Sequence, residues 1–348
     1  MTPADRIIAQ AMIEHQLDLL RLSAYSQDVA LRILEQMGLG LESLLREGNL
    51  TEFGKARVNR LLADATEIID RYYEALNTSS TTTLSGVARA QSGATERAVA
   101  GLNISLEAGV PSTSFVNALV SDALVEGAKT SAWWSKQSSD TTFKFANAIR
   151  QGLIQGETTE QIVVRVAGSA TQAGVMDVAR SNARSLVHSS IQQVANDARM
   201  ATFQKNSDVV KGMRQISTLD SHTTEICIAY DGAEWDLEGE PIGDTELPFN
   251  GGPPRHWGCR SVLVPITKTF KELGLNIPEL TPTLRATGQG PQKMTMRGWM
   301  DSRTKEQLNE QLGVGRAALY REGKITLTQL VDMKGNPMTL GQLERKYK

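Results

Sequence analysis

The sequence has little of what several large protein classes require. Only 2 of its 348 residues are cysteine, which excludes a disulfide framework, and aromatic residues make up 5%, which is low for a large β-sandwich. No stretch approaches the roughly 20 consecutive apolar residues that span a bilayer. The first 20 residues include Asp5 and no uninterrupted apolar run, so we expect neither a signal peptide nor a membrane partner.

The composition is otherwise that of a folding chain. Apolar residues make up 40% of the sequence and charged residues 22%, whereas a disordered chain is poorer in apolar residues. A chain of 348 residues exceeds what one hydrophobic core usually supports, so two or three modules are expected.

Charge is unevenly distributed although the net charge is only −2. Residues 215–266 carry 2 basic and 9 acidic side chains, and residues 267–348 carry 14 basic and 8 acidic ones. A basic segment of this kind indicates either a solvated tail or one that meets an anionic partner such as double-stranded DNA.

Apolar residues at helical spacing indicate helices in two long regions. One stripe runs through residues 58–76, and a second, rich in small residues that permit close helix packing, runs through 179–198. Arg180, Arg184 and Arg199 lie off the second stripe. The polar sequence from Asn77 to Gly86 favours a loop or hinge.

After residue 211 the pattern changes to short β-branched runs separated by turns, which predicts a small sheet. The expected fold class is therefore mainly α, with a small α+β module of short antiparallel strands and a helical C-terminal tail. The expected organisation is a helical region over 1–76, a polar hinge over 77–86, a helical region over 87–211, the β-containing module over 212–266, and a linker with a helical basic tail over 267–348.

The candidate ligands for a metal lie in the β-containing module. His256 and Cys259 are three residues apart, and Cys227 lies 29 residues before His256. Cysteine and histidine are the ligands that tetrahedral Zn²⁺ prefers, and a structural site has four of them. His222 or Asp220 could supply the fourth, but neither spacing is diagnostic. A zinc-dependent hydrolase or nuclease, with Asp231 or Glu225 as base, is the alternative enzymatic interpretation.

The order of the motifs resembles that of a known family. The turn LDSHTTEICIAYDG, the later stretch PPRHWGCRS, the preceding helix with ARSNAR and the C-terminal sequence from GWMDSRT onward are similar to the minor head proteins of tailed bacteriophages, the Mu F-like phage head morphogenesis family. The resemblance covers roughly residues 150–348. Many relatives carry further cysteines where this sequence has Thr224 and Ser261.

The resemblance implies a structural protein rather than an enzyme, with no catalytic residues and no cofactor other than a possible zinc. Such a protein is expected inside the virion head near the portal, and in the host cytoplasm during assembly. Its implied partners are the portal protein, a scaffold or major capsid protein, and double-stranded DNA bound by the 267–348 tail. It would act in head morphogenesis, during DNA packaging or ejection.

The missing cysteines leave three interpretations of the module open. Cys227, His256 and Cys259 could bind zinc, could pack and hydrogen-bond without a metal, or the two cysteines could form a disulfide once a virion leaves the reducing cytosol. In the metal-free interpretation the loop is rigid scaffold: Gly251, Gly252 and the two following prolines restrict its path. Trp257 is then an apolar anchor, and Arg260 pairs with a carboxylate of the acidic segment 215–266.

Overall fold

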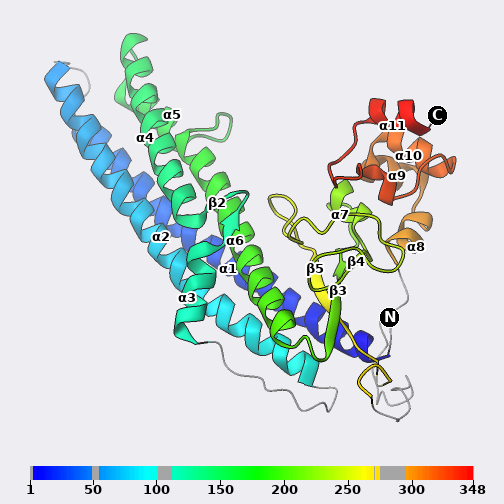
Figure 1. Ribbon diagram of the computed structural model, residues 1–348. Helices are drawn as coiled ribbons and strands as arrows, with labels where there is room; N and C mark the ends of the chain where they lie inside the picture. Colours follow the sequence, from blue (N-terminus) through cyan, green and yellow to red (C-terminus); the bar gives the residue numbers. More distant parts are fainter. Residues whose placement is uncertain (1–2, 49–54, 101–111, 270, 275–294, 348) are drawn as a thin grey trace. The chain divides into compact units, whose positions relative to one another are not determined.

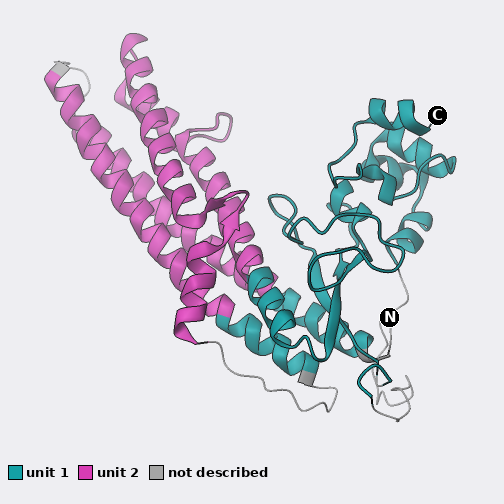
Figure 2. Cartoon of the chain, viewed as in Figure 1, with its two compact units in different colours: residues 1–18, 89–111, 195–348 teal, residues 19–88, 112–194 magenta. Residues whose placement is uncertain are grey.

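The computed structural model describes residues 3–48, 55–100, 112–269, 271–274 and 295–347 (Figure 1). These residues form two compact units (Figure 2). Unit 1 comprises residues 1–18, 89–111 and 195–348, and unit 2 comprises 19–88 and 112–194. The division falls inside three helices, α1 (Pro3–Glu47), α2 (Lys55–Ala100) and α6 (Val175–Lys205), which contribute to both units. Residues 275–294 of the expected linker lie outside the described residues.

Unit 2 is built almost entirely of helices. Parts of α1, α2 and α6 are joined there by α3 (Thr113–Asp122), α4 (Thr130–Ile154), α5 (Thr159–Ala167) and a two-stranded ribbon of β1 (Leu124–Val125) and β2 (Ala128–Lys129). The stripe predicted at 58–76 supplies buried Ile69 and Leu76 from α2. Trp134 and Phe145 of α4 are also buried. Amphipathic faces therefore assemble this unit, as the helical spacing predicts.

The expected loop or hinge at Asn77 to Gly86 is wrong, because these residues lie inside α2. Their hydroxyl groups are accommodated within the helix. Thr81, Thr82 and Ser85 each donate to the carbonyl oxygen four residues earlier, at 2.9–3.0 Å. Side-chain bonds of this kind satisfy the hydroxyls without interrupting the backbone ladder. A polar composition alone thus does not indicate a break in the helix.

Unit 1 contains the predicted small sheet. Its strand order is β4-β3-β5, with β3 (Val210–Ile216) antiparallel to both β4 (Glu234–Trp235) and β5 (Val262–Thr267). Met213 lies opposite Trp235 on one side and Pro265 on the other. The short helix α7 (Glu225–Ala229) lies between β3 and β4 in the chain. The expected fold class is confirmed: mainly α, with a small antiparallel sheet.

The C-terminal residues are part of the same core as the sheet. They form α8 (Met296–Asp301), α9 (Lys305–Leu312), α10 (Val314–Arg321), the 3₁₀ helix η2 (Thr328–Leu330) and α11 (Leu340–Tyr347). Buried Leu312 and Leu343 belong to one hydrophobic cluster with Trp235. Thr304 begins α9 with a capping box, in which its hydroxyl and the Gln307 side chain satisfy each other's backbone N–H groups. The expected domain boundaries stay a prediction.

Within the described parts of the chain, we find no helix with the length and apolar character needed to cross a bilayer.

Candidate functional site: a cysteine and histidine cluster

Two segments of unit 1 form the candidate site. The first is the short helix α7, which begins after Thr224 and has Cys227 as its middle residue. The second is residues 249–261, which we call the clasp segment and which carries His256 and Cys259. Gly258 lies between these two with φ of 78°, a backbone conformation that other residues rarely adopt. The Cys259 N–H donates to the His256 carbonyl at 3.1 Å across this tight turn, so both side chains point to one place.

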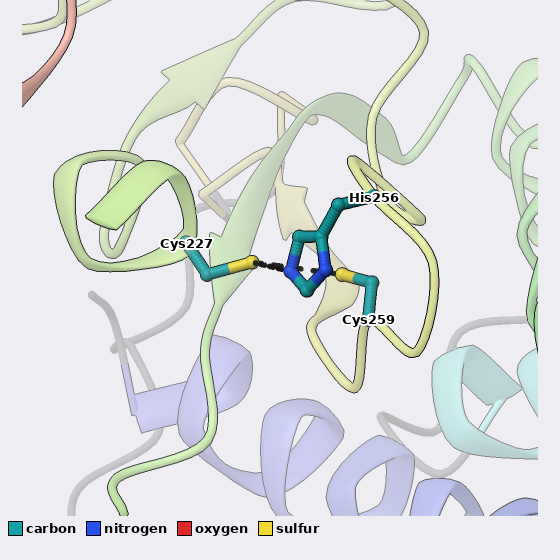
Figure 3. Close-up of side chains that lie close together, drawn as sticks. All are labelled: Cys227, His256 and Cys259. Atoms are coloured by element: carbon teal, nitrogen blue, oxygen red, sulfur yellow. Dashed lines mark hydrogen bonds between the residues drawn. The ribbon is translucent and has the colours of Figure 1, made fainter. Parts of the chain in front are cut away.

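Figure 3 shows the three predicted ligands brought together. The Cys227 Sγ lies 3.2 Å from the His256 Nε2 and 3.6 Å from the Cys259 Sγ. The potential ligand atoms of all three residues lie within 4.8 Å of one another. Both thiols are buried, and they are not joined by a disulfide. Residues from two segments of the chain therefore meet in a compact group of two sulfur atoms and one nitrogen atom.

The hydrogen bonds of His256 fix its tautomer. Its Nδ1 lies 2.9 Å from the carbonyl oxygen of Trp257, which can only accept, so Nδ1 carries the proton. Its Nε2 then presents a lone pair toward Cys227 and toward the Thr224 hydroxyl, which is 2.9 Å away.

The two thiols differ in pKa because of the hydrogen bonds between them and to their neighbours. The pKa of Cys259 is lowered well below its ordinary value, first by the hydrogen bond from the Cys227 thiol and then by the neighbouring His256 ring and the backbone N–H of Arg255. The bond to Cys259, together with burial, raises the pKa of Cys227. The Cys259 sulfur is therefore the one that more readily carries a negative charge.

The clasp segment is held by an ion pair and an aromatic contact. Both terminal nitrogens of Arg260 donate to the Asp220 carboxylate, one of them at 2.8 Å, which confirms the pairing expected for this arginine. Arg255 lies over the Tyr230 ring at 3.5 Å and donates to Gln215 at 2.7 Å. The expectation that Trp257 anchors the loop is wrong, since its side chain is 40% exposed. Phe249 packs on buried Trp235 instead, with ring centroids 5.4 Å apart.

Other predicted site residues are placed elsewhere. His222 is exposed and is not among the clustered ligands, although it lines the same small surface pocket as Cys227 and His256. Glu225 pairs with Arg316 at 3.0 Å. Asp231 accepts from the backbone N–H groups of Ser217 and Met296, and burial raises its pKa. Both carboxylates proposed as a catalytic base are therefore engaged in structural contacts.

Two neighbours of the cluster were not predicted as site residues. The Thr224 hydroxyl contacts His256, and the Ser261 hydroxyl hydrogen-bonds the Cys227 thiol and lies 3.1 Å from the Ser217 hydroxyl. The only sequence signal for them is the family resemblance, which implies cysteine at both positions. The structure shows why such positions matter, because both side chains border the cluster.

A comparison with known protein families matched the region that contains the cluster. Residues 143–264 match the model of the family described as phage Mu protein F like protein. These residues are therefore similar to the Mu F-like family. The matched range runs from within α4 through β5 and contains all three clustered residues. Searches of curated proteins and of solved structures gave no match.

The match ends before the C-terminal helices and begins after α1 and α2, so those elements are characterised by the structure alone.

Proposed function

We propose that the protein is a minor head component of a tailed phage, which acts by binding the portal protein and the scaffold or major capsid protein inside the procapsid. The observation that carries the proposal is the Mu F-like match over residues 143–264. The engaged positions of Asp231 and Glu225 support a binding role over hydrolysis. On this proposal the protein resides inside the head near the portal and catalyses no reaction.

An exposed apolar face in unit 2 supplies a surface for such a partner. On α4, Phe143 is 66% exposed and Ile154 is 86% exposed. Their separation of 11 residues is close to three helical turns, so both lie on one face of α4, about 16 Å apart along the axis. Singly exposed apolar side chains are common on protein surfaces, so this face is a proposed contact that the double variant below tests.

Co-expression with the portal protein tests this role. We expect the full chain to co-purify with the portal, and the Phe143→Ser/Ile154→Ser variant to lose most of that association. The matched control is Val314→Ser/Met333→Ser, which removes two apolar side chains from unit 1 that are 71% and 64% exposed. Failure of the wild-type chain to co-purify, together with its absence from purified virions by mass spectrometry, would refute the proposal.

A second part of the proposal is that the C-terminal residues contact double-stranded DNA. Three of their basic side chains, Arg297, Lys324 and Lys334, are exposed. Replacing all three by Gln should weaken binding of a DNA duplex and make its salt dependence shallower by up to about 3 in slope, since each lost phosphate contact removes about one. Substitution is preferable to deletion, because the helices of this region belong to the core.

The matched control for DNA binding replaces Arg57, Arg60 and Arg71, which are exposed basic residues of α2. It removes the same formal charge from the chain. Equal loss of affinity in the two triple variants would show that net charge, rather than the C-terminal surface, determines binding.

A further inference from the structure

We propose that Cys227, His256 and Cys259 bind one Zn²⁺ ion, which joins α7 to the clasp segment. The three ligand atoms come from two separate segments and converge on one point (Figure 3). The inference goes beyond a role in head morphogenesis and does not depend on it.

The distances between the ligand atoms fit a tetrahedral zinc centre. With zinc to sulfur distances of about 2.3 Å and zinc to nitrogen distances of about 2.0 Å, the edges of a tetrahedron are about 3.8 Å between two sulfurs and about 3.5 Å between sulfur and nitrogen. The corresponding distances here are 3.6 Å for Cys227 Sγ to Cys259 Sγ and 3.2 Å for Cys227 Sγ to His256 Nε2. These two distances are within a few tenths of an ångström of the tetrahedral edges, and the third pair, His256 and Cys259, lies within 4.8 Å.

The imidazole is already in the state that a metal requires. A metal-bound histidine donates its other ring N–H to a backbone carbonyl or carboxylate, which fixes the ring and the tautomer. The His256 Nδ1 lies 2.9 Å from the Trp257 carbonyl oxygen, and the Nε2 lone pair faces the Cys227 sulfur. This arrangement costs no reorientation of the ring when the ion binds.

The donor set selects the kind of metal. Two thiolates and one imidazole are soft or intermediate ligands, which favour Zn²⁺ over the oxygen-preferring Mg²⁺ and Ca²⁺. No carboxylate belongs to the cluster among the described residues. Two thiolate charges also balance the charge of the ion, which matters because both sulfur atoms are buried.

The fourth coordination position is assigned to water. Cys227 and His256 line a small surface pocket together with Thr224 and Ser261, so a solvent molecule can reach the cluster from this side. The Thr224 hydroxyl, 2.9 Å from the His256 Nε2, is placed to hydrogen-bond such a water. The ion would act as a structural link, because the candidate bases Asp231 and Glu225 are bound elsewhere.

Metal analysis of the full chain tests the proposal. The chain is purified without a metal-binding tag or chelator, under reducing conditions, and incubated with equimolar Zn²⁺ before desalting. We expect about one zinc per chain for the wild type and below about 0.1 for Cys259→Ser and His256→Gln. The matched control is His222→Gln, which removes the exposed histidine of the same pocket and should keep full stoichiometry. Circular dichroism verifies that each variant is folded.

Cobalt substitution gives a second readout that does not depend on stability. Co²⁺ bound to two thiolates in a tetrahedral site should produce sulfur-to-metal charge-transfer absorption and intense d–d bands, which Zn²⁺ then abolishes. A folded wild-type chain with less than about 0.1 zinc and no such bands would overturn the proposal. So would a stoichiometric Cys227 to Cys259 disulfide in protein from virions, or a loss of zinc in His222→Gln equal to that in His256→Gln.

Discussion

Arg199 donates from Nη2 to the Oε1 of Gln91 at 3.1 Å, in the helical part of unit 1, and neither side chain reaches solvent. A second bond runs from the same nitrogen to the Gln16 Oε1 at 3.4 Å. Both acceptors are neutral amides, so burial deprives the guanidinium of water without providing a carboxylate, and it lowers the pKa of Arg199. Among the described residues, these two amide oxygens are the acceptors that stabilise the cation, which makes each of them important.

Replacing Gln91 by Leu should lower the free energy of unfolding by about 1–3 kcal/mol, because the buried cation loses its closer acceptor. Adding Gln16→Leu and Arg199→Met should recover part of that loss, since the charge is removed as well. Urea unfolding measures both variants. The matched control, Gln10→Leu, replaces a glutamine whose bond to Glu14 is exposed, and should change stability by less than about 0.5 kcal/mol. A triple variant less stable than Gln91→Leu would contradict this account.

Thr224→Cys should convert the cluster into a four-ligand site. The Thr224 Oγ1 is 2.9 Å from the His256 Nε2, so a sulfur at this position lies at ligand distance from the proposed ion. We expect zinc affinity to rise at least about tenfold, which corresponds to about 1.4 kcal/mol. Competition with a chromophoric chelator measures the affinity. Thr224→Ser keeps a hydroxyl at the position and should leave the affinity near that of the wild type; equal affinities for both variants would place residue 224 outside the coordination sphere.

The ion pair of Asp220 with Arg260 should affect how the free energy of unfolding changes at acidic pH. The hydrogen bonds from Arg260 hold the pKa of Asp220 at about 2, below its ordinary value of 3.8. A carboxyl group with a lowered pKa in the folded state contributes stability that is complete above pH about 4 and is lost as pH falls toward 2. Asp220→Asn should therefore be less stable than the wild type at neutral pH, with the difference shrinking over this interval. Urea unfolding at a series of pH values measures it.

The control for this pH dependence is Asp244→Asn, which neutralises an exposed carboxylate of the same module. We expect its difference from the wild type to remain small and nearly constant over the same pH range. A difference for Asp220→Asn that does not change between pH 4 and pH 2 would contradict the assigned pKa.

Thr82→Pro tests the continuity of α2 through its serine- and threonine-rich part. Proline within a helix removes a backbone hydrogen bond and clashes with the preceding turn, so we expect a loss of about 3 kcal/mol or more. Thr82→Ala should change stability by no more than about 0.5 kcal/mol, because the threonine is exposed and alanine is a good helix former. Thermal unfolding followed by circular dichroism distinguishes the two. Tolerance of proline here would restore the interpretation of residues 77–86 as a hinge.

The contrast between Arg199 and the stripe beside it shows where sequence reasoning succeeds and where it stops. The stripe at 179–198 predicts the buried Ala183, Leu186 and Val194 of α6. The same pattern leaves Arg199 off the stripe, yet its side chain is only 2% exposed. Periodicity identifies the apolar face of a helix, but it does not reveal that α6 is covered on further sides, where buried Ser190 and Asn196 also lie.

The candidate site shows the same limit. Residue chemistry was sufficient to select Cys227, His256 and Cys259, because few other side chains in the module bind soft metals. It did not exclude His222, since the direction of an exposed side chain after a turn depends on the local backbone. The contact of Thr224 with His256 spans 32 positions and is set by the turn at Gly258, so spacing alone did not predict it.

The carboxylate of Asp5 is buried and accepts hydrogen bonds at 2.9 Å from both the backbone N–H and the hydroxyl of Thr267, at the end of β5. During synthesis on the ribosome, Asp5 is made before unit 2, whereas Thr267 is added after every residue of unit 2 has been made. At about 5–20 residues per second, Thr267 follows the last residue of unit 2 by roughly 4–15 s. The helices of unit 2 therefore have time to assemble on the nascent chain while the N-terminal turn of α1 still waits for its partner strand. Completion of unit 1 thus depends on a segment translated after unit 2, and a truncated chain that ends before β5 would deprive the buried Asp5 of the two hydrogen bonds from Thr267.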